Sequence, residues 1–249
     1  MPKKTNHDSV IAVCVQEPFE DGSKMDLGAI QGSDLKFLHQ GFIADTISHA
    51  LSVEEADTRL YYIDDAQRKK FMGIVLDYVK EHAEGDVARA LKSKFSHHEL
   101  SKCRWGLRIE KVFDECFKDG YQNVLVIGSR TPTVTPPMMQ RALRMLAESD
   151  AVFGPTPEGR YYTIGLRGDS KIKLSEFDWK SPSIYSDVVA AFDKAGLAWA
   201  ELEIWYAVET PDEIELMVRD INQYRFEDDD VTARETEAVM ERLLSKLGI

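Results

Sequence analysis

The sequence predicts a three-layer α/β/α fold built around a mostly parallel β-sheet. Short, continuous apolar runs rich in β-branched residues occur repeatedly, as is typical of strands that helices cover on both faces. Between these runs lie longer segments whose apolar residues recur at helical spacing. The two patterns alternate along the 249-residue chain without a linker, an internal repeat or a low-complexity segment, which favours an α/β fold.

The N-terminal elements follow this alternation clearly. Residues 9–15 form a continuous apolar run and predict the first strand, and residues 16–32 form a polar loop that is too long and too rich in proline and glycine for an ordinary connector. A helix begins at Ser33. Residues 58–63 predict the second strand, and residues 65–82 predict a helix with one apolar face. The long first loop is typical of a functional segment.

The middle of the chain is less regular before it returns to the pattern. Residues 83–104 show a poor pattern, with one short helix expected at 87–95. A helix over 107–117 is closed by Gly120, which suits a left-handed C-terminal cap. Residues 124–127 then predict a third buried strand.

The C-terminal half repeats the alternation and ends in a separate helix. The remaining predicted elements are a helix from Pro136 after a Thr135 cap, strands at 151–153 and 161–166, a helix at 182–195, a strand at 202–208 and a helix from Thr210-Pro211. We expect residues 1–226 to form one domain. Residues 227–249 are expected to form an acidic turn and a helix, started by the capping box Thr232-Ala-Arg-Glu235, that packs on the domain or on a partner, including a second copy in a homodimer.

Composition limits the classes of function. The net charge of −12 and the scattered basic residues argue against nucleic-acid binding, although local donors can still hold the phosphates of a nucleotide. No window approaches the roughly 20 apolar residues of a membrane span. The three cysteines are not spaced as a zinc site and indicate a reducing compartment, and the N-terminus shows no secretion signal. We therefore expect a cytoplasmic protein.

The candidate site lies where the strands end. Ligands of open parallel sheets bind outside the carboxyl ends of the strands, so the loops after Val15, Ile127 and Phe153 should converge on one crevice. Residues 123–132, Asn-Val-Leu-Val-Ile-Gly-Ser-Arg-Thr-Pro, are the centre of this prediction. The sequence has no nucleophile elbow, Walker loop or dinucleotide-binding glycine motif, which disfavours a serine hydrolase, a P-loop protein and a classical dehydrogenase.

Four segments occur in the order typical of one family. They are Gly128-Ser-Arg-Thr-Pro132, Gly154-Pro-Thr-Pro-Glu-Gly-Arg-Tyr-Tyr-Thr-Ile-Gly-Leu166, Trp179-Lys-Ser-Pro182 and Ala207-Val-Glu-Thr-Pro-Asp212. Together they resemble the rSAM/selenodomain-associated transferase 1 family (domain of unknown function 2064), whose members resemble nucleotide-diphospho-sugar transferases of the GT-A fold. Weaker similarity at Trp105-Gly-Leu-Arg108 and in the loop from Gln16 to Lys24 extends the resemblance over nearly the whole chain.

The resemblance implies a donor site whose metal position is altered. In GT-A enzymes an acidic residue at the end of the middle strand usually holds Mg²⁺ or Mn²⁺, but here that position is Arg130. A guanidinium group cannot bind a metal ion and can instead bind phosphate oxygens, so we expect no metal ligands. The residues implied to bind substrate are Lys24, Arg108, Ser129, Arg130, Arg160, Tyr161 and Trp179. Glu158 or Glu209 is implied as the general base.

Several alternatives stay open at this point. Arg130 could form an ion pair with Glu158 or Glu209, Lys24 could be a solvated loop residue, and Trp179 could be a packed aromatic side chain. The leading hypothesis is a glycosyltransferase that uses a nucleotide-diphosphate sugar, without a metal ion, on an unknown acceptor. The alternatives are a non-catalytic protein that binds a nucleotide or a protein partner in the same crevice, and a metal-dependent nucleotidyltransferase.

Overall fold

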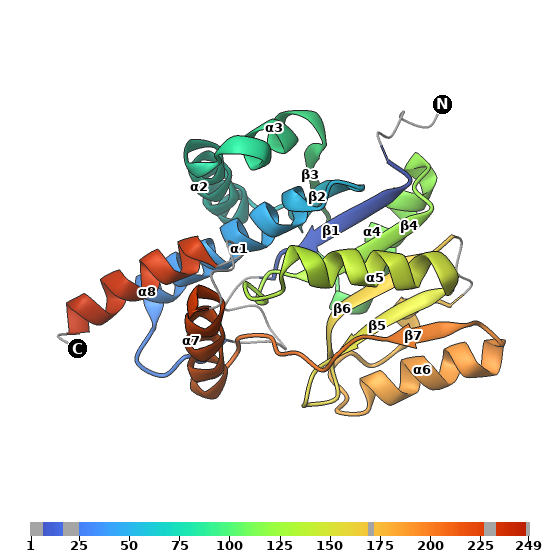
Figure 1. Cartoon of the computed structure of the whole chain (residues 1–249). Coiled ribbons are helices and arrows are strands. Elements are labelled where there is room, and N and C mark those ends of the chain that lie inside the picture. The colour runs from blue at the N-terminus through green and yellow to red at the C-terminus, as the bar shows by residue number, and fades with distance from the viewer. Residues whose placement is uncertain (1–6, 17–24, 169–171, 227–232, 248–249) are drawn as a thin grey trace.

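The computed structural model describes residues 7–16, 25–168, 172–226 and 233–247 (Figure 1). The strands are β1 (Ser9–Cys14), β2 (Ala56–Ile63), β3 (Phe95–Leu100), β4 (Asn123–Gly128), β5 (Ala151–Pro155), β6 (Tyr161–Arg167) and β7 (Trp199–Glu201). The helices are α1 (Gly32–Ser52), α2 (Ala66–His82), α3 (Gly85–Ser93), α4 (Trp105–Asp119), α5 (Pro136–Glu148), the 3-10 turn η1 (Leu174–Glu176), α6 (Ile184–Ala195), α7 (Pro211–Phe226) and α8 (Arg234–Leu247).

The seven strands form one sheet in the order β3-β2-β1-β4-β6-β5-β7. β6 is antiparallel to both of its neighbours, and the other pairings are parallel. The predicted mostly parallel sheet is therefore confirmed. The carboxyl ends of β1, β4 and β5 lie at the same edge, so the loops that follow these strands start from one side of the sheet.

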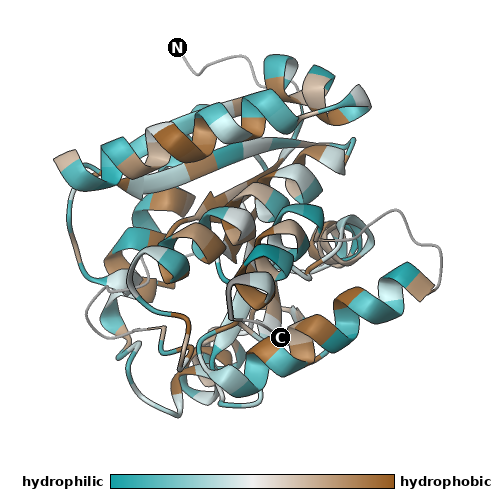
Figure 2. Cartoon of the chain, turned by 90° about the vertical axis from the view of Figure 1, so that its left-hand side faces the viewer, coloured by the Kyte–Doolittle hydropathy of each residue, from teal (hydrophilic) through white to brown (hydrophobic). Residues whose placement is uncertain are grey.

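Helices cover both faces of the sheet, which confirms the three-layer architecture (Figure 1). Along β4 the side chains alternate, so that Leu125 and Ile127 belong to the core cluster shared with α1, α2 and α5, while Val124 and Val126 belong to the cluster shared with α4 and α6. Strands buried on both faces have no polar side, which is why their sequences are continuous apolar runs. Figure 2 shows the corresponding pattern in the helices, whose ribbons carry both hydrophilic and hydrophobic segments.

Two predictions about strands were wrong. β3 occupies residues 95–100, where no strand was expected. This strand lies at the edge of the sheet and pairs with β2 through its backbone, while polar side chains such as His97 and Glu99 stay exposed, so its sequence lacks the apolar pattern of a buried strand. Residues 202–208 are apolar but form no strand. The Leu202 N–H donates to the Phe153 carbonyl oxygen, next to the paired residues of β7 and β5. Beyond it the backbone donates only separate hydrogen bonds, from Trp205 to Pro155 at the end of β5 and from Val208 to Arg130, so the segment passes the strand ends without forming a ladder.

The C-terminal helix α8 packs on α1 and α7 through Val239, Met240 and Leu243. Asp45, in the middle of α1, accepts hydrogen bonds from the backbone N–H groups of Glu235 and Thr236, at 3.0 and 2.8 Å. A buried carboxylate on another helix thus satisfies the first turn of α8. Thr232, expected to start this helix, lies outside the described residues. None of the helices in the described part of the chain combines the length and apolar character that a bilayer-spanning helix requires.

The Asp45 contact predicts a dependence of stability on pH. Burial raises the pKa of Asp45 to about 7, against the opposing effect of its hydrogen bonds from Thr236 and Glu235. Because an unfolded aspartate has a pKa of about 3.9, only the folded state binds this proton between about pH 4 and 7, and its contribution to stability is lost as pH rises through that window. We expect the free energy of unfolding of the native protein, relative to that of Asp45→Asn, to fall by a few kcal/mol from pH 4 to pH 7.

Urea denaturation of both proteins at several pH values measures this difference. His39 titrates in the opposite sense, because burial and then the charge of Arg130 lower its pKa to about 3, but it is present in both proteins and cancels. A difference that stays constant from pH 4 to pH 8 would contradict the prediction.

Candidate functional site

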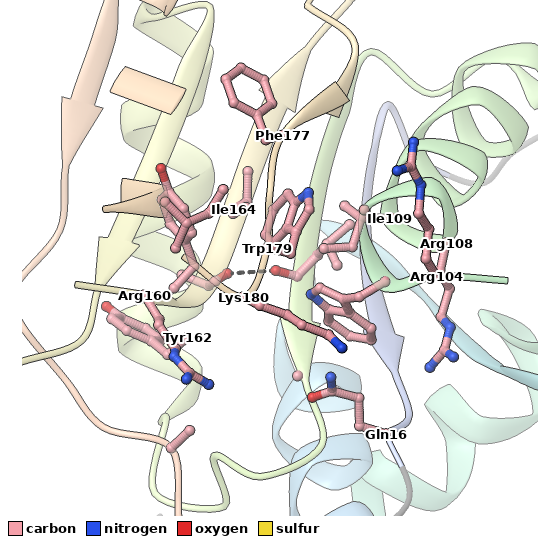
Figure 3. Close-up of a pocket in the computed structure, with 18 of the residues that line it drawn as sticks. Gln16, Arg104, Arg108, Ile109, Arg160, Tyr162, Ile164, Phe177, Trp179 and Lys180 are labelled. Atoms are coloured by element: carbon pink, nitrogen blue, oxygen red, sulfur yellow. Dashed lines mark hydrogen bonds between the residues drawn. The ribbon is translucent and has the colours of Figure 1, made fainter. Parts of the chain in front are cut away.

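A cavity of about 500 Å³ opens at the carboxyl edge of the sheet and extends along the face covered by α4 and α6 (Figure 3). Its walls come from Gln16 after β1, the loop after β4, the start of α4, strand β6 and the segment 176–184. This volume lies within the range of small-molecule sites. The predicted convergence of the loops after β1 and β4 is thus seen in one cavity.

Arg130 and Glu209 form an ion pair in the wall of this cavity. Arg130 is only 2% exposed, and its Nη1 donates to Oε1 of Glu209 at 3.0 Å. Nη1 of Arg160 lies 3.8 Å from the other oxygen, Oε2, of the same carboxylate. The hydrogen bond from the Val208 N–H to the Arg130 carbonyl oxygen holds the two chain segments together. Both oxygens of Glu209 therefore face guanidinium groups.

Ser129 supports the loop that carries Arg130 and does not line the cavity. Its buried Oγ accepts a hydrogen bond from the Gln16 N–H at 3.2 Å and lies 3.1 Å from Nε2 of His39. Burial, followed by the charge of Arg130, lowers the pKa of His39 to about 3, so this imidazole is neutral near pH 7. Ser129 thereby connects the ends of β1 and β4 to α1.

Arg108 lines the cavity from the first turns of α4 and is 2% exposed. Its Nη1 donates to the carbonyl oxygen of Val15 at 3.4 Å, and its guanidinium carbon lies 5.2 Å from the ring centroid of Trp105. The side chain therefore joins the end of β1 to the start of α4. In Figure 3 the guanidinium groups of Arg104 and Arg108 lie on one side of the cavity and that of Arg160 lies on the other.

Aromatic side chains form another part of the wall. The rings of Trp179 and Tyr161 lie 6.0 Å apart between centroids, and Nε1 of Trp179 donates to the Leu174 carbonyl oxygen at 2.7 Å. Gly106 permits this arrangement, because a Cβ atom there would lie 2.3 Å from Nε1 of Trp179. Tyr161 and Tyr162 both line the cavity, but Tyr161 packs against the core cluster on the side of α4 and α6, while Tyr162 belongs to the core cluster of the opposite face.

The chain matches the model of one known protein family. Residues 46–181, more than half of the chain, match the family described as "Uncharacterized protein conserved in bacteria (DUF2064)". The chain belongs to the DUF2064 family. No curated protein matches it significantly.

Solved structures share the fold of this DUF2064 chain. A candidate nucleotide-diphospho-sugar transferase from Desulfovibrio desulfuricans G20 is 24% identical with a TM-score of 0.72, over 95% of this chain and 98% of that chain. CMP:2-keto-3-deoxy-manno-octonic acid synthetase, complexed with CTP, is 14% identical with a TM-score of 0.50, over 86% of this chain and 98% of that chain. At these identities the similarity establishes a shared nucleotide-diphospho-sugar transferase fold.

The structure brings some, but not all, of the residues that the resemblance implied together in the cavity. Arg108, Arg130, Arg160, Tyr161, Trp179 and Glu209 line the cavity together. Glu158 is exposed on the turn between β5 and β6 and does not line it, and Lys24 lies outside the described residues. Sequence reasoning missed Gln16, Arg104 and Lys180, which also line the cavity and lie within or beside the recognised motifs.

The described residues of this site provide few ligands for a divalent cation. Among the residues that the structure describes, no three or more His, Cys, Asp or Glu side chains are placed to hold a metal ion. The implied metal position itself is Arg130, and the carboxylate beside it, that of Glu209, is shared by Arg130 and Arg160. Metal sites of this kind need oxygen donors, so these side chains do not fit a divalent cation.

Proposed function

We propose that this chain is a glycosyltransferase that uses a nucleotide-diphosphate sugar and holds the diphosphate with arginine side chains instead of a metal ion. The observation that carries the proposal is the buried Arg130 guanidinium, paired with Glu209 where GT-A enzymes bind their cation. Guanidinium groups bind phosphate oxygens in bidentate fashion and stabilise the charge that develops on a leaving diphosphate. Arg108 and Arg160 add to this positive site, and Lys24 belongs to it by resemblance.

Glu209 has a defined part in this proposal. A bound diphosphate competes with the carboxylate for Arg130 and Arg160, because each guanidinium can bind either anion. Displacement from one arginine leaves a Glu209 oxygen able to accept the proton of an acceptor hydroxyl group. Glu209 lines the cavity and Glu158 does not, so the general base is assigned to Glu209.

Binding of nucleoside diphosphates without a metal ion tests the proposal. We expect the uridine, guanosine, cytidine, adenosine or thymidine diphosphate that matches the site to raise the melting temperature in EDTA. A ligand at 100 times its Kd adds about 2.7 kcal/mol, or roughly 5–10 °C for a chain of this length. Thermal-shift titrations in EDTA and in Mn²⁺ measure the effect.

The same titrations separate the alternative functions. Binding that requires Mn²⁺ would favour a nucleotidyltransferase, and no stabilisation by any nucleotide would rule out the transferase. The protein could also bind a nucleoside diphosphate in EDTA but release none from any nucleotide sugar in an end-point assay with a panel of acceptors. That result would favour the non-catalytic alternative.

A further inference from the structure

The inner part of the cavity is apolar. Its wall, which we call the inner wall, consists of Ile109, Val126, Ile164 and Ile184, each 4% exposed or less. These side chains belong to the core cluster between the sheet and the helices α4 and α6. They offer a ligand contact area but no hydrogen bonds.

Two hydroxyl groups beside the inner wall already donate their protons within the protein. The Thr163 hydroxyl group donates to the Val126 carbonyl oxygen at 2.9 Å, and the Tyr161 hydroxyl group donates to the Tyr185 carbonyl oxygen at 3.0 Å. A sugar ring buried here would find no hydroxyl proton left on these two groups for its own oxygen atoms, so it would lose more hydrogen bonds to water than it regains, at a cost for each unpaired group. The inner part of the cavity therefore favours an apolar group over a sugar.

Aromatic rings bound this apolar space. Trp179 is fixed by its hydrogen bond to the Leu174 carbonyl oxygen and lies against Tyr161, while Trp105 and Phe177 also line the cavity. Aromatic pairs favour offset or edge-to-face arrangements, which gives a planar ring an advantage over a flexible chain in such a space. A flexible chain would also lose more conformational entropy on binding.

Positive charge surrounds the aromatic part. The cavity is lined by the cations Arg104, Arg108, Arg130, Arg160 and Lys180 and by the anions Glu176, Asp178 and Glu209. In Figure 3 the Lys180 side chain crosses the cavity between the arginines on its two sides. This excess of positive charge, in a chain of net charge −12, is complementary to a negatively charged ligand.

We propose that the acceptor of this site is an aromatic compound that also carries a negatively charged group. The aromatic ring occupies the space between Trp179, Tyr161 and the inner wall, and the anionic group faces the exposed cations Arg104 and Lys180. The inference rests on the proposed function, because it assigns this space to the acceptor and leaves the nucleotide diphosphate to Arg130 and Arg160.

Three phosphate compounds with different substituents test the inference on the full chain. Isothermal titration with phenyl phosphate, hexyl phosphate and inorganic phosphate, in the absence of nucleotide, compares a ring, a flexible chain and no apolar group. We expect phenyl phosphate to bind about tenfold more tightly than either of the others. Equal affinity for phenyl phosphate and inorganic phosphate, or tighter binding of hexyl phosphate, would overturn the proposal.

Two tryptophan variants locate the binding. Trp179→Leu is expected to remove the preference for phenyl phosphate and to leave the affinity for inorganic phosphate unchanged. The matched control is Trp199→Leu, since Trp199 is half-buried, donates to Asp193 and does not line the cavity. A preference for phenyl phosphate that survives in Trp179→Leu contradicts the assignment.

Titration in the presence of a nucleoside diphosphate separates this inference from the proposed function. Binding of both ligands at once supports an acceptor site for the ring. Displacement of phenyl phosphate by the nucleoside diphosphate would overturn it, because the aromatic space would then belong to the nucleotide base. Binding of phenyl phosphate to a protein that binds no nucleoside diphosphate would support the ring site and reject the transferase.

Discussion

Arg130→Met is expected to abolish most of the binding of nucleoside diphosphates while the protein stays folded. In the proposed function the arginine donates charge-assisted hydrogen bonds to phosphate, each worth about 1.5–3 kcal/mol, so the affinity should fall on the order of 10- to 100-fold. The free energy of unfolding should change less, because methionine is an apolar side chain of similar length and keeps the packing around position 130. Glu209, which loses its partner, is partly exposed and keeps its ion pair with Arg160. Isothermal titration and thermal denaturation measure the two effects separately.

Arg141→Met provides the matched control, since it removes the same charge from a surface pair. Arg141 is exposed, pairs with Glu203 and does not line the cavity. Equal losses of affinity in the two variants would mean that the net charge, and not the position of Arg130, decides binding. Arg130→Asp adds a further comparison, because recovery of binding in Mn²⁺ would show that the arginine replaces a metal-binding carboxylate.

The sequence predicts the parts of the fold that burial determines. β1 and β4 are continuous apolar runs because helices cover both of their faces, and this pattern is visible without the structure. β3 could not be predicted in the same way, because its place at the edge of the sheet depends on backbone pairing with β2 and leaves His97 exposed. Residues 202–208 were predicted wrongly for the converse reason: Leu202, Tyr206 and Val208 are buried, so the segment has the composition of a strand, but it passes the strand ends without extending the sheet.

The candidate site was predictable in position but not in its contacts. Parallel strands bring the residues after their carboxyl ends to one edge, which places Gln16 and Arg130 in the same cavity. The choice between Glu158 and Glu209 as partner of Arg130 depends on how residues 202–208 cross the sheet, and no local pattern encodes that path. The contact between His39 and Ser129 likewise joins residues that lie far apart in the sequence.

Gly106→Ala is expected to destabilise the protein through a single added methyl group. The new Cβ atom would lie 2.3 Å from Nε1 of Trp179 and 2.8 Å from the Leu174 carbonyl oxygen, so both partners of that hydrogen bond must move. Overpacking of this kind costs about 1–3 kcal/mol, which exceeds the 0.5–1 kcal/mol that alanine gains over glycine in a helix. Chemical denaturation should therefore show a lower free energy of unfolding.

The control for this prediction is a second helical glycine with open space around it. A Cβ atom at Gly73, in α2, would meet no other heavy atom within 4 Å, so Gly73→Ala should raise the free energy of unfolding by about 0.5–1 kcal/mol. The opposite signs expected for two identical substitutions isolate the contact with Trp179 from helix propensity. If Gly106→Ala stabilised the protein as much as Gly73→Ala, Trp179 would not be held against α4, and the aromatic wall of the cavity could not be a fixed surface for a ligand.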